Sequence, residues 1–88
     1  MTHRISEHRK RIDDLDAKIL ELIEERIQEA MSIRKLKIDN DIPLFTPERE
    51  EELIQRLVVL SAGRIPAVVI QEIWGSIIKG GKQTADSK

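Results

Sequence analysis

Residues 5–38 read ISEHRKRIDDLDAKILELIEERIQEAMSIRKLKI, and this stretch decides the fold. It contains neither glycine nor proline, and apolar residues recur in it at seven-residue steps, with isoleucine at one position and leucine at another (Ile5, Ile12, Ile19 and Ile33; Leu15, Leu22 and Leu36). A repeat of this kind is typical of a helix that packs lengthwise against another helix. We therefore predict one long helix over about residues 6–38, which Asn40, Asp41 and Pro43 bring to an end.

Two shorter helices are predicted after it. Thr46 suits the N-cap of the second, Pro47 suits its first turn, and Gly63 is expected to close it. Pro66 opens the third helix, whose apolar side includes Trp74. No stretch shows the alternation of a strand, so the predicted fold class is all-α, with one long, one short and one medium helix.

The third helix is expected to end or loosen at Gly80 and Gly81. Residues 83–88 are then polar and typical of a frayed end. This gives one domain over residues 1–80 and a C-terminal tail over residues 81–88, partly disordered.

The length of the first helix predicts self-association. About 33 residues of helix span about 50 Å, whereas a compact chain of 88 residues has a radius of gyration of about 12 Å. The apolar repeat therefore extends beyond what one chain can cover. The simplest partner is a second copy, so we predict a homodimer in which the long helices pair.

Composition excludes several classes of function. Aromatic residues make up 2% of the chain and its formal charge is −1, so neither a base-stacking surface nor a global positive field for nucleic acid is expected. The sequence has no cysteine, no signal peptide at its start and no apolar run of membrane-spanning length. We expect a cytoplasmic helical domain with no metal, no cofactor and no membrane contact.

Cations on apolar faces are the informative residues. Lys37 lies 11 positions after Arg26 and therefore only about 20° away around the helix, with the small Ala30 between them. Arg49 lies in line with Leu53 on the second helix. Each cation alone could reach solvent or pair with an acid across an interface. Three together favour a pocket between helices for a small, multiply anionic ligand, because unpaired buried charge is costly.

Four stretches add a more specific pattern: RKRIDDLD at 9–16, IEER at 23–26, KLK at 35–37 and PERE at 47–50. In this order and spacing the chain resembles the all-helical chorismate mutases, from about Ser6 to Ile78. The resemblance implies two intertwined three-helix chains with two equivalent active sites. It also implies a pericyclic rearrangement of chorismate to prephenate, which needs no nucleophile, metal or cofactor.

The resemblance further implies a role for individual residues. Arg26 and Arg49 would bind the two substrate carboxylates, and Lys37 would donate to the ether oxygen of the breaking bond and to a carboxylate. Glu50 would hold the substrate hydroxyl. Arg9 would reach the site of the partner subunit, and Thr46 would contact the same region as well as cap its helix.

The third helix departs from the family pattern. Relatives usually carry a Gln or Glu eleven residues after the aromatic residue that Trp74 represents, but this position is Ala85 here. The expected catalytic donor is therefore Gln83, unless the site lacks this donor or the tail orders with ligand.

Two other functions stay open beside the mutase. One is an isochorismate-pyruvate lyase of the same fold, and the other is a non-catalytic helical dimer module. The chain is expected to work alone, although activation by another enzyme of the pathway also stays open.

Overall fold

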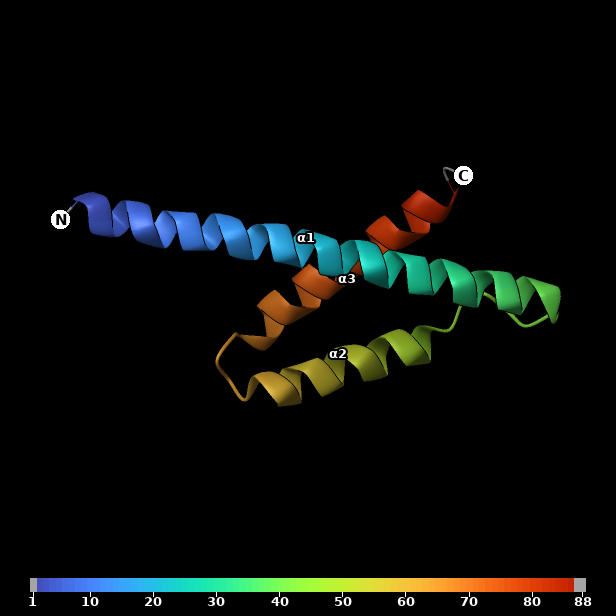
Figure 1. Cartoon of the computed structure of the whole chain (residues 1–88). Coiled ribbons are helices and arrows are strands. Elements are labelled where there is room, and N and C mark those ends of the chain that lie inside the picture. The colour runs from blue at the N-terminus through green and yellow to red at the C-terminus, as the bar shows by residue number, and fades with distance from the viewer. Residues whose placement is uncertain (1, 87–88) are drawn as a thin grey trace.

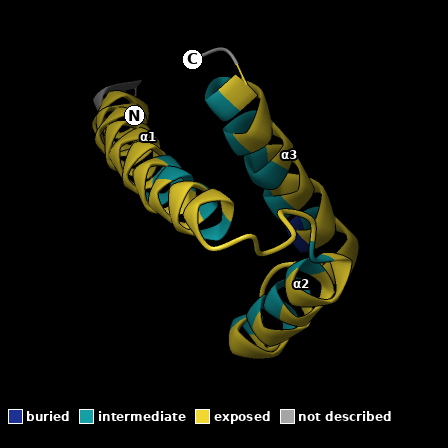
Figure 2. Ribbon diagram, turned by 90° about the vertical axis from the view of Figure 1, so that its right-hand side faces the viewer, coloured by how far each residue is buried: buried dark blue, intermediate teal, exposed yellow. Residues whose placement is uncertain are grey.

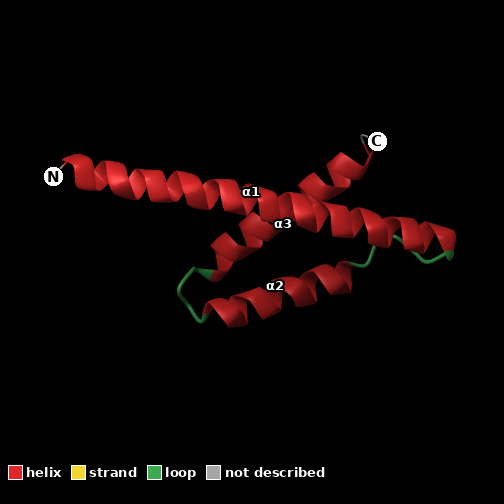
Figure 3. Ribbon diagram, viewed as in Figure 1, coloured by secondary structure: helices red, strands yellow, loops and turns green. Residues whose placement is uncertain are grey.

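The computed structural model describes residues 2–86, with side chains from residue 4 onward, and contains three helices. These are α1 (Thr2–Asp39), α2 (Pro47–Ser61) and α3 (Ala67–Asp86) (Figure 1). Every regular element within residues 2–86 is a helix (Figure 3). The all-α fold and the order long, short, medium are thus confirmed. Met1, Ser87 and Lys88, which include the end of the expected tail, lie outside the described residues.

The end of α1 is fixed by a backbone cap. The N–H of Ile42 donates to the carbonyl of Lys37 at 2.8 Å, and the N–H of Asp41 donates to that of Ile38 at 3.3 Å. Asp41 adopts a left-handed conformation with φ 55°. This is the pairing of a Schellman motif, which satisfies the last carbonyls of a helix. Lys37 therefore lies in the last, capped turn of α1.

The start of α2 rests on the backbone of Thr46. The Thr46 carbonyl accepts hydrogen bonds from the N–H groups of Arg49 at 3.1 Å and Glu50 at 3.4 Å. Thr46 does occupy the N-cap position, but its side chain makes no capping hydrogen bond. At the other end, Ala62 and Gly63 both adopt left-handed conformations, with φ 50° and 79°. The helix therefore stops close to the predicted glycine.

The predicted break at Gly80 and Gly81 is wrong, because α3 continues through both glycines to Asp86. The Thr84 hydroxyl donates to the Gly80 carbonyl at 2.8 Å within this stretch. Gly81 faces α1, where an added Cβ would meet Ile27 Cγ1 at 3.7 Å. Gly81 thus lies where α3 passes close to α1, whereas a Cβ at Gly80 would meet nothing within 4 Å. Packing there, with the turns that follow, outweighs the low helix propensity of glycine.

The helices pack through α3. It contacts both α1 and α2, whereas α1 and α2 make no close backbone approach to each other within the described residues. Figure 1 shows α3 crossing α1 near its middle, and Figure 2 shows α2 set apart from α1. This arrangement leaves an open space bounded by all three helices, at the end of the molecule where α1 finishes.

Very little of the chain is buried. Ile70, at 2% exposure, is the sole buried residue among those described, and most of the ribbon in Figure 2 is exposed. The radius of gyration is 16.6 Å, and the longest extent is 59 Å. A compact chain of this length would have a radius of gyration of about 12 Å. The structure is therefore extended, with its apolar repeat uncovered.

None of the three helices, over the residues described, has a segment long and apolar enough to cross a bilayer.

Candidate active site

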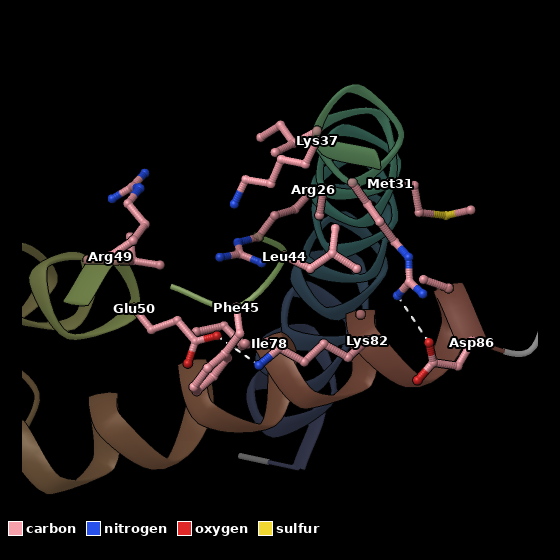
Figure 4. Close-up of a pocket in the computed structure, with 16 residues that line it drawn as sticks. Arg26, Met31, Lys37, Leu44, Phe45, Arg49, Glu50, Ile78, Lys82 and Asp86 are labelled. Carbon is pink, nitrogen blue, oxygen red and sulfur yellow. Dashed lines mark hydrogen bonds and ion pairs between the residues drawn. The ribbon is translucent and has the colours of Figure 1, made fainter. Parts of the chain in front are cut away.

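A cavity of about 420 Å³ lies where the three helices come together. Its walls are the C-terminal half of α1, the loop before α2 with the first turns of α2, and the last turns of α3 (Figure 4). The six residues from α1 are Arg26, Ala30, Met31, Ile33, Arg34 and Lys37. Apolar side chains from the other elements complete much of the wall, including Phe45, Leu53 and Ile78.

The structure brings the predicted cations to this cavity. Arg26 and Lys37 line it from α1, with Ala30 between them, and Arg49 lines it from α2. Figure 4 shows Arg26 and Lys37 extending from α1 toward the space between the helices, with Arg49 across from them. Within the described residues, none of the three makes an ion pair. Their charges are therefore available to a ligand.

Glu50 is the acidic residue of the α2 wall, and it is not free. Its Oε1 lies 2.9 Å from Nζ of Lys82 on α3, and the Glu50 side chain is 34% exposed. The same Lys82 Nζ lies 5.0 Å from the centre of the Phe45 ring, in the geometry of a cation–π contact. One lysine thus connects α3 to α2 and to the loop before it.

Sequence reasoning missed Lys82, although a signal for it was present. Trp74, Ile78 and Lys82 follow one another at four-residue spacing, so Lys82 continues the apolar stripe of α3 as Arg26 continues that of α1. A second missed pair is Arg34 and Asp86, whose Nη1 and Oδ1 lie 3.0 Å apart at the edge of the cavity. These two residues are 52 positions apart, and nothing in their local sequence connects them.

Three predicted site residues do not line the cavity of this chain: Arg9, Thr46 and Gln83. Thr46 lies next to it as the N-cap of α2, and Gln83 is exposed on α3. Arg9 is exposed on the N-terminal half of α1, and the 17 residues from it to Arg26 correspond to about 25 Å of helix. Ala85, at the position expected to carry a donor, does line the cavity.

The lining residues define what the cavity can do chemically. Five are basic and two are acidic, and both acidic side chains are engaged by Lys82 and Arg34. None of the described lining residues is Ser, Thr, Cys or His, so the wall offers no hydroxyl, thiol or imidazole for covalent or general acid–base work. It suits a small anion that is held, oriented and stabilised by positive charge.

Comparisons with known proteins point to one family. The sequence profile of the family described as chorismate mutase type II matches residues 8–85. A protein of Methanocaldococcus jannaschii named chorismate mutase is 40% identical over 57 residues, which cover 65% of this chain and 58% of that protein.

Two larger proteins match as well, both named bifunctional chorismate mutase/prephenate dehydratase. The one from Aquifex aeolicus is 33% identical over 78 residues, covering 84% of this chain and 22% of that protein. The one from Neisseria gonorrhoeae is 34% identical over 71 residues, covering 81% and 19%. This chain thus spans less than two thirds of each of these three relatives. No solved structure matches it significantly.

Proposed function

Because the chain belongs to the chorismate mutase type II family, we propose that it converts chorismate to prephenate. The observation that carries the proposal is the set of three cations around one cavity, Arg26, Lys37 and Arg49, none of which has an ion pair within the described residues. Chorismate is a dicarboxylate with a hydroxyl group, and the cavity offers positive charge for the first and the Glu50 carboxylate for the second. The relatives named above support the same activity.

The reaction suits a wall that has no hydroxyl, thiol or imidazole group among its described lining residues. It is an intramolecular rearrangement in which one C–O bond breaks and one C–C bond forms, with no atom gained or lost. The enzyme's task is to hold the folded conformer of the substrate and to stabilise the negative charge that develops on the ether oxygen. Donors that are fixed before the reaction perform both tasks, since they cost no reorganisation when the charge develops.

Each lining residue then has a proposed role. Arg26 and Arg49 bind the two carboxylates from opposite walls, where a guanidinium can make two parallel hydrogen bonds. Lys37 donates to the ether oxygen and to a carboxylate, from the capped last turn of α1 that holds its backbone in place. Glu50 accepts a hydrogen bond from the substrate hydroxyl. Thr46 is proposed to act through its position at the start of α2, next to Arg49 and Glu50.

We also propose that the working unit is an intertwined homodimer, in which Arg9 completes the partner's site. Two observations support it. The apolar repeat of α1 is exposed, with Ile12 at 54% and Ile19 at 52%, and exposed apolar stripes of this size call for a partner. Arg9 lies about 25 Å along α1 from Arg26, too far to serve its own cavity. If the long helices of two chains pair, the same distance along α1 would bring Arg9 to the cavity of the other chain.

The test is the turnover of chorismate by the purified protein, followed by the loss of chorismate absorbance and the appearance of prephenate. A parallel assay with isochorismate separates the mutase from a pyruvate lyase of the same fold. We expect prephenate from chorismate, and little pyruvate from isochorismate. Release of pyruvate from isochorismate without prephenate formation would assign the lyase, and no reaction with either would contradict an enzymatic role.

The remaining expectations from the sequence stay predictions. These are the cytoplasmic location, the division of the chain after residue 80, and operation without an activating partner enzyme. For Gln83, the donor role that the sequence predicts stands against the small effect expected from its place outside the cavity, and substitution decides between the two.

A further inference from the structure

The third helix contributes two charged side chains to the cavity wall, Lys82 and Asp86, and Lys82 is the one that reaches α2. Its Nζ lies 2.9 Å from Glu50 Oε1 and 5.0 Å from the centre of the Phe45 ring. Figure 4 shows the Lys82 side chain running along the floor of the cavity to Glu50 and Phe45. The ion pair uses only Oε1, so the second carboxylate oxygen of Glu50 is not taken by Lys82.

Glu50 would otherwise have three competing partners. Arg26, Lys37 and Arg49 line the same cavity, and none of them has an ion pair within the described residues. A flexible carboxylate in a partly buried space next to unpaired cations is attracted to them, and the attraction is stronger than in bulk water. A Glu50 that moved toward these cations would neutralise the charge that is to bind the ligand.

We propose that Lys82 is a positioning residue that holds Glu50 at the α2 wall and away from the ligand-binding cations. This inference rests on the function proposed above. One oxygen of Glu50 is engaged by Lys82, and the other is left to accept a hydrogen bond from the substrate hydroxyl. The site is thereby specific for a dicarboxylate that also carries a hydroxyl donor on the Glu50 side. A ligand with a third anionic group at that place is excluded by charge.

The ring of Phe45 supports this role. It is 65% exposed, yet Lys82 Nζ lies over its face, so the aromatic ring provides a second attraction that keeps the lysine at this wall. The same helix also offers a control lysine for comparison with Lys82. Lys79 lies one turn earlier on α3, is exposed and does not line the cavity.

The experiment is a double-mutant cycle of Lys82→Met and Glu50→Gln, with KM and kcat for chorismate measured separately for the four proteins. We expect Lys82→Met to raise KM by about tenfold and to change kcat by less than about threefold, because the freed Glu50 competes with the substrate for the cations. In the Glu50→Gln background, where no charge competes, Lys82→Met should change KM by less than about twofold.

Three further proteins complete the design. Lys82→Arg keeps the ion pair and should stay within about threefold of wild-type KM, whereas the matched control Lys79→Met should not change KM. Helical content by circular dichroism checks that each variant is folded, and Lys82→Gln replaces Lys82→Met in the cycle if the methionine variant is not. Calorimetric binding of a bicyclic dicarboxylate analogue of the transition state should weaken by the same factor as KM rises.

The outcomes separate this inference from the proposed function. Equal effects of Lys82→Met in the two Glu50 backgrounds, an unchanged KM, or a loss confined to kcat would each overturn the positioning role while leaving the mutase activity in place. A wild-type protein that neither converts chorismate nor binds the analogue would contradict the proposed function itself, and the inference with it.

Discussion

The two halves of α1 have the same sequence pattern but very different surroundings. Every side chain from Arg4 to Leu22 is exposed, and no other described part of this chain covers that half. From Ile23 onward, half-buried residues recur on one side of the helix, where it meets α3 and lines the cavity. The seven-residue repeat runs through both halves. The repeat residues stay exposed in both halves, with Ile33 at 53% and Leu36 at 61% in the second. What differs is that residues beside the repeat, such as Ile23 and Ile27, are half-buried in the second half alone.

The two halves also differ in whether the apolar repeat contains a charged residue. In the covered half, the repeat is interrupted by Arg26, and the cation faces the cavity. In the uncovered half the repeat is unbroken, with Ile5, Ile12 and Ile19. An unbroken stripe stabilises association, whereas an interrupted one builds a site. Four substitutions test these inferences.

The largest effect is expected in the covered half, from Lys37→Ala. Loss of one fixed donor to a developing negative charge typically lowers turnover by about 10²–10³-fold, or roughly 3–4 kcal/mol. Helical content should be unchanged, because Lys37 makes no ion pair within the described residues. The assay is chorismate loss, with Lys35→Ala as the matched control, since Lys35 is exposed and does not line the cavity. Near-normal turnover by Lys37→Ala would contradict the assignment.

The second effect belongs to the uncovered half. If Ile19 packs against a partner chain, Ile19→Ala should lower the free energy of unfolding by about 2–4 kcal/mol, measured by urea denaturation. Lys18→Ala, beside it but off the stripe, is the control. In a solitary chain Ile19 is 52% exposed, and the same substitution should then change stability by only about 0.5 kcal/mol. That smaller value would argue against pairing of the long helices.

Arg9→Ala tests whether the uncovered half of α1 in one chain contributes to the site of the other chain. Loss of a charged hydrogen bond to the substrate should lower kcat/KM by about 10–100-fold. Mixing Arg9→Ala chains with Lys37→Ala chains, after unfolding and refolding together, should restore about a quarter of wild-type activity, because each mixed dimer regains one intact site. The absence of restoration would place Arg9 outside the partner's site.

The smallest effect is expected from Gln83→Ala. Gln83 is exposed and does not line the cavity, whereas Lys82 beside it does. Turnover should change by less than about twofold, within the range of surface substitutions. A loss comparable to that of Lys37→Ala would instead support Gln83 as the donor that the sequence predicts, in a conformation other than the one described here.

The sequence was informative wherever a local rule decides the structure. The apolar repeat predicted α1, Pro47 and Pro66 predicted the starts of α2 and α3, and the angular spacing of Arg26 and Lys37 predicted that they share a face. Local rules were misleading at Gly80 and Gly81, since packing against α1 keeps that stretch helical. Local rules also did not predict the pairs Lys82–Glu50 and Arg34–Asp86, because these depend on how α3 crosses the other helices.

Among the side chains that the structure describes, Ile70 alone is buried, and this has a consequence for how the protein behaves on dilution. A chain that covers so little apolar surface by itself gains little from folding alone, so folding and association are expected to be one event governed by mass action. The melting temperature should then rise with protein concentration, and activity per chain should fall as the solution is diluted. Ligand should oppose that fall, since each bound molecule favours the assembled form.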